Sequence, residues 1–484
     1  MNKSKFIKML LLGIIAFIPF FMPCPEGLSL VAWRLLGVYF ATIVGLILKP
    51  YNESIMLFIS LSMSAIFITL TPNQVVQAKA VLEGYSDTSV WLVFSAFSLS
   101  IAFVHTGLGK RIAYLLIDKL GSTTLRMGYV NVFLELFLAP ATPSNTARAG
   151  GIVTPIMNSV SVALGSDPVE SPKKAGRYLM LNVYMITKTT SYLFLTAMAP
   201  NAMAISLMGP ILGLDMDYAT WFLLASVPGL ICLFLTPLIL YFIIKPELKK
   251  VNNKEIARKG LQELGPIKNS EKILLVIFFL ALICWVFGGM LPYKLSAWIV
   301  AISAMTSLLV VSVIDWEIFV KNKGAWATLM WYGGIIGLAK VLEKANFFQW
   351  LASSLESMLK GVDFGGPYLA LAFILICTCL IRYVFASGSA YVVAMVPVFA
   401  IVGKFIGAPV ELLFIGILFS NAYGGMLTHY TGGPGPIVFA CGYNDIPSWW
   451  KAGFILVVCS LVVHLTIGVL WWKFLISNAL LFGH

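Results

Sequence analysis

The chain has 484 residues, of which 59% are hydrophobic and only 11% are charged. About a quarter of the residues of a soluble protein are charged, so this composition excludes a soluble globular protein. The formal net charge of +12 could suggest a nucleic-acid partner, but much of the basic excess falls in short loops between apolar segments, as the positive-inside rule describes. We therefore predict an all-α, polytopic membrane protein that lies in the lipid bilayer and binds no nucleic acid.

Apolar segments that approach or exceed the roughly 20 residues needed to span a membrane recur along the chain. The first follows three lysines and ends in FMPCPEG without a small-residue cleavage site, so we interpret it as a retained helix rather than a signal peptide. The predicted spans are 7–22, 29–48, 53–71, 89–106, 178–208, 219–244, 273–291, 296–314, 325–342, 409–440 and 451–475. Two further apolar stretches, 127–163 and 366–403, are interrupted at their centres by polar residues.

The charged loops predict the orientation of these spans. Residues 245–272 form the longest hydrophilic run, with eight Lys or Arg against four Glu, and loops 107–126 and 164–177 are also basic. Loop 209–218 contains two Asp and no basic residue. The positive-inside rule then gives eleven spans in the plasma (inner) membrane, with the N-terminus in the cytoplasm and the C-terminus outside.

The two halves of the chain resemble each other. Each has a long apolar helix, then an interrupted stretch, then a helix broken by Pro with Asn or Gly, in TAMAPNAMA at 196–204 and THYTGGPGPIV at 428–438. An odd number of spans separates corresponding points, which indicates an inverted repeat with a site near the bilayer midplane. The predicted divisions are an N-terminal helix, the first repeat, a cytoplasmic linker and the second repeat, at 1–27, 28–244, 245–272 and 273–484.

We interpret 127–163 and 366–403 as re-entrant hairpins, because each is too long for one helix and is interrupted where a tip would lie. The tips would be SNTA at 144–147 and SGSA at 387–390. Their hydroxyls, together with free N–H groups at the start of the following helix, are suited to bind a carboxylate. The alternative is that these small polar residues only pack helices together.

Four basic residues lie within or beside these segments, and buried charges in membranes are usually functional. Lys188 is predicted near mid-bilayer, with snorkelling as the alternative, and His429 lies in the second broken helix. Arg148 follows the first tip and could bind a substrate carboxylate or pair within the hairpin. Arg382 precedes the second tip and could instead pair with Glu135. We expect these four residues to compensate the charge of an anionic substrate.

Several other residues have simpler interpretations. The seven cysteines lie mostly inside apolar segments and are expected to be free, buried thiols. His105, His464 and His484 are expected at helix boundaries or in the tail. The chain has no HExxH or GxSxG motif and no paired carboxylates, so we do not expect an enzyme, a metal site or a cofactor.

Five stretches resemble the divalent anion/sodium symporter (DASS) family, which includes the INDY-type dicarboxylate transporters. They are TSVWLVFSAF (88–97), TGLGKRIA (106–113), APATPSNTARAGG (139–151), FASGSAYVVAMVPV (385–398) and GPIVFACGY (435–443). The resemblance covers nearly the whole chain and is strongest to bacterial citrate/succinate- and tartrate/succinate-type antiporters and chloroplast 2-oxoglutarate/malate translocators. It implies eleven helices plus two hairpins, a homodimer, and elevator-type movement of a transport domain past a scaffold.

The resemblance also implies which residues contact the substrate. Carried onto this sequence, they are Ser144, Asn145, Thr146, Ser387, Gly388 and Ser389, with Pro200, Asn201, Thr431 and Gly432 nearby. Gly388 stands where sodium-coupled members have Asn, which argues against a sodium site. We therefore expect sodium-independent exchange of di- or tricarboxylates such as malate, succinate, fumarate, 2-oxoglutarate, tartrate or citrate. The alternatives are a sodium-coupled symporter of the same fold and an anion channel.

Overall fold

The computed structural model describes residues 3–72, 76–288, 291, 293, 295–359 and 365–478. Within these ranges the chain is helical, and the one β-type pairing is an isolated bridge between Thr123 and Lys250. His484 lies outside the described residues.

The described residues of the first half form ten α-helices and four short 3₁₀ or π segments. The helices are α1 (Lys3–Phe21), α2 (Leu30–Leu48), α3 (Glu53–Thr69), α4 (Thr88–Thr106), α5 (Leu108–Leu120), α6 (Thr124–Leu138), α7 (Thr154–Ala163), α8 (Gly176–Leu193), α9 (Ala199–Leu212) and α10 (Tyr218–Ile244). The short segments are η1 (Ala78–Ser86), η2 (Ala139–Ala141), η3 (Thr146–Val153) and η4 (Leu195–Ala197).

The second half continues in the same way. Its helices are α11 (Asn253–Leu264), α12 (Asn269–Phe287), α13 (Ala297–Val310), α14 (Trp316–Val320), α15 (Lys323–Lys344), α16 (Phe347–Leu359), α17 (Pro367–Leu380), α18 (Gly388–Phe405), α19 (Val410–Tyr423), α20 (Pro434–Phe439), α21 (Ile446–Val463) and α22 (Val469–Ser477). Its short segments are η6 (Ile381–Val384), η7 (Gly424–Met426) and η8 (His464–Gly468).

The lengths and composition of these helices fit a membrane protein. Among the described residues, nine helical segments are long and apolar enough to cross a bilayer, and four shorter apolar helices accompany them. Many large apolar side chains on α1, α12 and α17 point outward, as lipid-facing helices require. The prediction of an all-α polytopic membrane protein is therefore confirmed.

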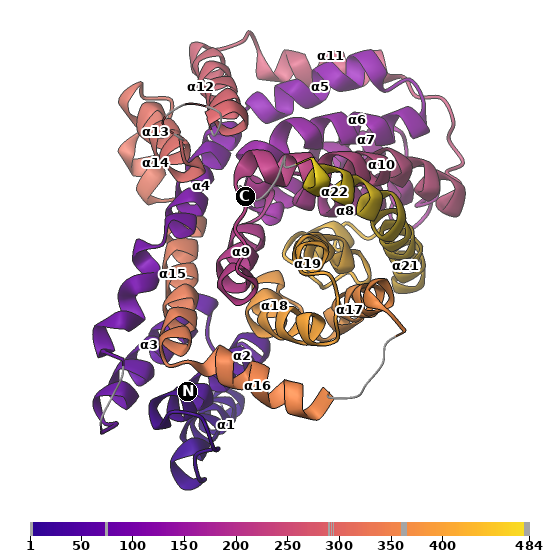
Figure 1. The fold of residues 1–484 in the computed structure, drawn as a ribbon. Helices are drawn as coiled ribbons and strands as arrows, with labels where there is room; N and C mark the ends of the chain where they lie inside the picture. Colours follow the sequence, from indigo (N-terminus) through magenta and orange to yellow (C-terminus); the bar gives the residue numbers. More distant parts are fainter. Residues whose placement is uncertain are drawn as a thin grey trace.

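The helices pack in two groups (Figure 1). In the first, which we call the scaffold (α1–α4, η1, α13 and α15), α15 packs on η1, α3 and α4, and α2 packs between α1 and α3. In the second, which we call the tip bundle (α6–α9 and α17–α20), α8 contacts α6, α7 and α19, while α18 packs against α9, α17 and α19. The two interrupted stretches thus lie in one bundle, although they are more than 200 residues apart in sequence.

The order of elements is the same in the two halves. A long helix (α4 or α15) is followed by a 13-residue helix (α5 or α16), an interrupted stretch, and a helix that breaks (α8 or α19). Both stretches are interrupted at the expected tips: 142–145 separates η2 from η3, and 385–387 separates η6 from α18. The residue boundaries of the repeats and of the linker stay predictions.

Three helices were not expected from the sequence. We interpreted 107–126 and 245–272 as connections, but they contain α5 and α11, which pack against each other, and α16 follows α15 directly. These helices are too short or too charged to resemble spans. Their apolar faces were visible only as a 3.6-residue periodicity within polar sequence.

Contacts between loops connect helix ends that the charge pattern predicts on the same side of the membrane. Arg111 Nε lies 2.6 Å from Glu271 Oε2, and Arg177 Nη2 lies 3.0 Å from Asp445 Oδ2, which joins ends predicted to be cytoplasmic. Burial raises the pKa of Asp445, but hydrogen bonds from Ser448 and the Arg177 charge outweigh it and leave the pKa below its usual value.

Ends predicted to be outside also contact one another. Ser29 Oγ donates to the Ala345 carbonyl at 3.2 Å, and the Trp471 indole donates to the Leu223 carbonyl at 2.8 Å. The contacts therefore agree with the predicted grouping of the ends. Which group faces the cytoplasm stays a prediction.

Candidate functional site

The first tip is an irregular turn held by its own side chains. Two prolines in APATP end regular helix after α6, and Ser144 Oγ accepts the backbone N–H of Ala147 at 3.2 Å where η3 begins. The Pro143 carbonyl accepts the backbone N–H of Ala199 at 3.0 Å. The turn is thereby fixed to the start of α9, which is the break that the sequence predicted in the first repeat.

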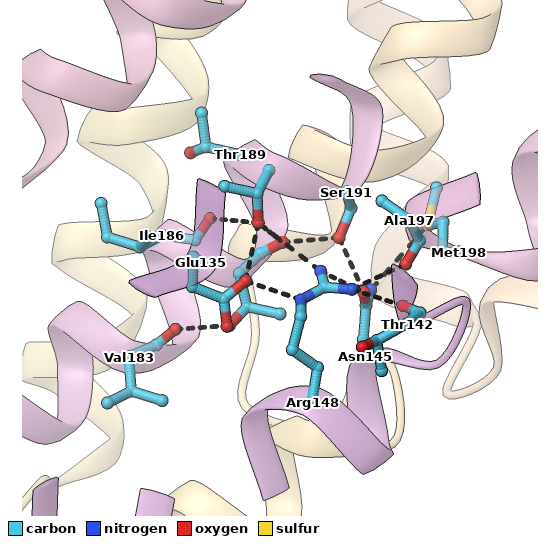
Figure 2. A network of polar contacts seen from close by, with 12 residues as sticks. Glu135, Thr142, Asn145, Arg148, Val183, Ile186, Thr189, Ser191, Ala197 and Met198 are labelled. Carbon is cyan, nitrogen blue, oxygen red and sulfur yellow. Dashed lines mark hydrogen bonds and ion pairs between the residues drawn. The ribbon is translucent and has the colours of Figure 1, made fainter. Parts of the chain in front are cut away.

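Arg148 is the centre of a buried network behind this tip (Figure 2). Its Nε lies 2.7 Å from Glu135 Oε2, and both side chains are fully buried. Its Nη1 donates to the carbonyls of Thr142 at 2.7 Å and Ala197 at 2.8 Å, and its Nη2 donates to Asn145 Oδ1 at 2.9 Å. The charge of Arg148 is therefore paired within the hairpin, the second of the two roles predicted for it, and we withdraw its assignment to charge compensation.

Both carboxylate oxygens of Glu135 accept hydrogen bonds. Thr187 and Thr190 of α8 donate to it at 3.0 and 2.8 Å. Because Glu135 is occupied by Arg148 and these hydroxyls, the suggested pairing of Arg382 with Glu135 is wrong. The network ties the first hairpin to α8.

The two predicted asparagines of the first repeat, Asn145 and Asn201, also make structural hydrogen bonds at the first tip and the helix break. Asn145 Oδ1 also accepts the Ser191 hydroxyl at 2.9 Å. The Asn201 amide donates to the Ser191 carbonyl at 2.7 Å and to the Phe194 carbonyl at 3.2 Å, which satisfies carbonyls freed by the helix break. Both asparagines hold the shape of the tip.

The second tip is simpler. Ser387 caps α18, since its Oγ accepts the backbone N–H of Ala390 at 3.3 Å. The backbone N–H of Gly432 donates to the Ala386 carbonyl at 3.0 Å, which joins this tip to the broken segment of the second repeat. The N-terminus of α18, with its free N–H groups and positive dipole end, therefore lies at the tip.

Two buried cations lie beside these tips without a counter-charge. Lys188 is 4% exposed and donates to the Thr431 carbonyl at 2.9 Å. Arg382 is 1% exposed, its guanidinium carbon lies 4.5 Å from the centre of the Tyr391 ring, and its Nε and Nη1 have no hydrogen-bond partner. Among the described residues, no carboxylate forms an ion pair with either cation.

Glycines show that the two cations lie close together. A Cβ placed on Gly425 would lie 3.0 Å from Lys188 Nζ and 3.3 Å from Arg382 Nη2. A Cβ on Gly432 would lie 2.8 Å from Lys188 Nζ. The ammonium and guanidinium groups therefore both lie against backbone that carries no side chain. Burying two unpaired cations costs several kcal/mol per ion, so the site is suited to an anion.

Predicted residues from both tips lie around these cations. A Cβ on Gly388 would lie 3.8 Å from both Arg382 Nη2 and Pro200 Cγ, and a Cβ on Gly433 would overlap Thr146 Oγ1. The structure therefore brings together Thr146, Pro200, Gly388, Thr431 and Gly432 with Lys188 and Arg382. Ser389, next to Gly388, is partly exposed.

His429 is not part of this group. Its Nδ1 accepts the Trp450 indole N–H at 3.3 Å, and its ring packs against Phe439 with centroids 4.6 Å apart. A nitrogen that accepts this hydrogen bond is unprotonated, so the arrangement favours a neutral imidazole. We therefore withdraw His429 as a charge-compensating residue.

Sequence reasoning missed two further features. Tyr184, one turn before Lys188, donates from its hydroxyl to the Gly425 carbonyl at 2.7 Å and so holds the loop that carries the glycines. His464 lies where α21 ends and η8 begins, as expected, but it is fully buried and packs against Tyr423 with ring centroids 4.9 Å apart. Both lie in apolar helices, where only tertiary contacts distinguish them. His105 is exposed in the last turn of α4, as expected. All seven cysteines are free, as expected, but only Cys232 and Cys379 are buried.

A separate cavity of about 1350 Å³ lies between the scaffold and the tip bundle. Its lining includes Asp87, Ser206, Lys340 and Lys404, all from ends predicted to be outside, but neither Lys188 nor Arg382. None of the predicted site residues lines it. Among the described residues, no group of three or more His, Cys, Asp or Glu could hold a metal ion.

The profile of the family described as "Sodium:sulfate symporter transmembrane region" matches residues 3–478. The chain belongs to this family, the DASS transporters. Membership confirms the resemblance seen in the sequence and establishes a transporter rather than an enzyme.

Several curated DASS-type relatives align over almost the whole chain. An "Uncharacterized transporter" of Haemophilus influenzae is 58% identical over 99% of both chains. The "Dicarboxylate transporter 1, chloroplastic" of Spinacia oleracea is 35% identical over 96% of this chain and 81% of its own. The "L-tartrate/succinate antiporter" of Escherichia coli (strain K12) is 34% identical over 95% of this chain and 96% of its own.

A solved structure shares the fold. The YdaH transporter of Alcanivorax borkumensis superposes with a TM-score of 0.55 at 10% identity, covering 82% of this chain and 88% of that one. At this identity the similarity concerns the fold alone.

Proposed function

We propose that this DASS transporter exchanges one di- or tricarboxylate for another across the inner membrane without sodium. The observation that carries the proposal is the pair of buried cations, Lys188 and Arg382, beside two tips that present hydroxyls and a helix N-terminus. The names of the spinach dicarboxylate transporter and the E. coli antiporter support the substrate class and the exchange mode. Homodimeric assembly and elevator-type movement are part of the proposal, by resemblance to the family.

The charges explain why exchange is preferred to net uptake. Arg148 is neutralised by Glu135, which leaves two unpaired positive charges, and a dicarboxylate carries two negative charges. The loaded site is then close to neutral. The empty site would move two fixed charges through a low-dielectric barrier, at several kcal/mol per ion. A site that holds substrate can therefore cross the membrane, but an empty site cannot. Each return step then requires a second substrate, so the transport is an obligate exchange.

Sodium independence has its own support. The guanidinium of Arg148 already donates to the carbonyls of Thr142 and Ala197 and to Asn145 Oδ1, oxygens of the type that sodium would bind. The second tip has Gly388 where sodium-coupled members have Asn. Fixed cations thus supply the charge that a symporter would take from sodium.

The test is uptake of labelled succinate and a panel of related acids into proteoliposomes. We expect uptake only when the liposomes contain an unlabelled dicarboxylate, with no effect of replacing sodium by choline. Lys188→Gln should lower exchange at least tenfold, because a charge-assisted hydrogen bond contributes about 1.5–3 kcal/mol. Lys344→Gln, an exposed lysine paired with Glu83 on the scaffold, is the matched control. Robust uptake into empty liposomes driven by a sodium gradient would establish the symporter alternative instead, and non-saturating flux would indicate a channel.

A further inference from the structure

A carboxylate of the scaffold contacts the second tip. Glu53 is the first residue of α3, and its Oε1 accepts the Ser387 hydroxyl at 3.2 Å. Ser387 is a predicted substrate contact and caps α18, so the Glu53 carboxylate lies near the positive end of that helix. This is the position at which a helix N-terminus binds an anion.

Glu53 can also leave the tip at little cost. Its side chain is 28% exposed, and Lys49 Nζ lies 3.8 Å from the same Oε1. If Glu53 released Ser387, its charge would stay beside Lys49 and water. The contact with Ser387 is therefore an exchangeable one, unlike the buried pair of Glu135 and Arg148.

The contact joins the two groups of helices, since Glu53 belongs to the scaffold and Ser387 to the tip bundle. A second hydrogen bond from the scaffold to α18 comes from the Tyr39 hydroxyl, which donates to the Val393 carbonyl at 2.5 Å. Tyr39 binds a backbone carbonyl that no substrate needs. Glu53, in contrast, occupies a hydroxyl that a substrate carboxylate would use.

We propose that Glu53 is a tethered competitor of the substrate: its carboxylate binds the Ser387 tip when the site is empty and is displaced when a substrate carboxylate binds. The inference rests on the proposed function, since it requires an anionic substrate at this tip. Because the competitor is attached, it acts at a high effective concentration and raises the half-saturation concentration of the substrate. It also gives the empty carrier a scaffold contact that the loaded carrier lacks.

The test is equilibrium binding of labelled succinate to the purified full-length protein. Glu53→Gln keeps the shape of the side chain but removes its charge, so we expect the dissociation constant for succinate to fall about five- to tenfold, the difference between a charge-assisted and a neutral hydrogen bond. Glu53→Asp keeps the charge but shortens the side chain, so it should give a similar fall by losing contact with Ser387. Glu83→Gln removes an acid of another scaffold ion pair and should leave binding unchanged.

The outcomes separate this inference from the proposed function. If wild-type protein binds no dicarboxylate and shows no exchange, the proposed function fails. If the wild type binds and exchanges succinate but Glu53→Gln and Glu53→Asp bind it with the wild-type constant or more weakly, the competitor role of Glu53 is overturned. If Glu53→Gln does not fold, Glu53→Asp alone decides in the same way.

Discussion

Two buried arginines of this transporter serve different purposes. Arg148 has a carboxylate partner and four further oxygen acceptors around it, so it holds the first tip in shape. Arg382 is equally buried but has unpartnered donors, so it is available to a ligand. Residue type and burial are the same for both, and only their partners distinguish an arginine that holds the fold from one whose donors are free to bind a ligand.

The pair of Glu135 and Arg148 gives a prediction about stability. Glu135→Gln leaves a buried guanidinium without its counter-charge, which costs about 3–5 kcal/mol. We expect a large drop in thermal stability and in the yield of monodisperse protein. The measurement is a melting curve in detergent.

A double variant separates folding from function. Glu135→Leu combined with Arg148→Met replaces the pair by apolar groups and should recover most of the stability. Exchange should remain poor, because Asn145 loses one of its two donors and the carbonyls of Thr142 and Ala197 lose theirs. A Glu135→Gln protein as stable as the wild type would contradict the structural role of the pair.

The helices of the scaffold pack closely where glycines face each other. A Cβ on Gly337 of α15 would overlap the Val81 carbonyl of η1, and one on Gly84 would overlap the Gly333 carbonyl. In membranes, such small residues allow backbones to approach and gain van der Waals contact. The 3₁₀ segment η1 is thereby fixed against the long helix α15.

This contact predicts that Gly337→Ala is destabilising even though alanine favours a helix. The new methyl group would force α15 and η1 apart, at a cost of about 1–3 kcal/mol. Gly13→Ala in α1 is the matched control, because nothing lies within 4 Å of its Cβ position, and it should be neutral or slightly stabilising. Equal melting temperatures for the two variants would show that the approach of η1 to α15 is not tight.

Across the whole molecule, contacts between helix ends form two sets, which correspond to the two predicted sides of the membrane. The ion pairs of Arg111 with Glu271 and of Arg177 with Asp445 join one set, and the contact of Ser29 with Ala345 joins the other. The basic loops belong to the first set. We therefore expect this set in the cytoplasm, by the positive-inside rule.

Labelling of engineered cysteines on intact cells tests the orientation. Asp215→Cys lies in an exposed loop of the set predicted to be outside, and Lys254→Cys lies in an exposed part of the other set. A membrane-impermeant maleimide should label the first without permeabilisation and the second only after it. The wild type, with its seven native cysteines, gives the background. The reverse pattern would invert the predicted topology.

The sequence alone determined the membrane environment, the helical class, the two interrupted stretches and the family. The first three depend on composition, segment length and local breakers such as Pro and Gly, which are visible in single segments of the chain. The tips at 144–147 and 387–390 were located for the same reason. The family was identified by the resemblance of five short stretches between residues 88 and 443. Amphipathic helices α5 and α11 were missed because polar residues conceal their short apolar faces.

Only the tertiary structure decided which charges are paired. Glu135 could have neutralised Arg148 or Arg382, and the choice depends on the position of α8, whose threonines complete the network around Glu135. Lys188 and Arg382 are 194 positions apart in the sequence, and only the fold brings both beside Gly425. Electrostatic balance is a property of distances between elements, so it could not be read from PSNTARAGG or from any other single stretch.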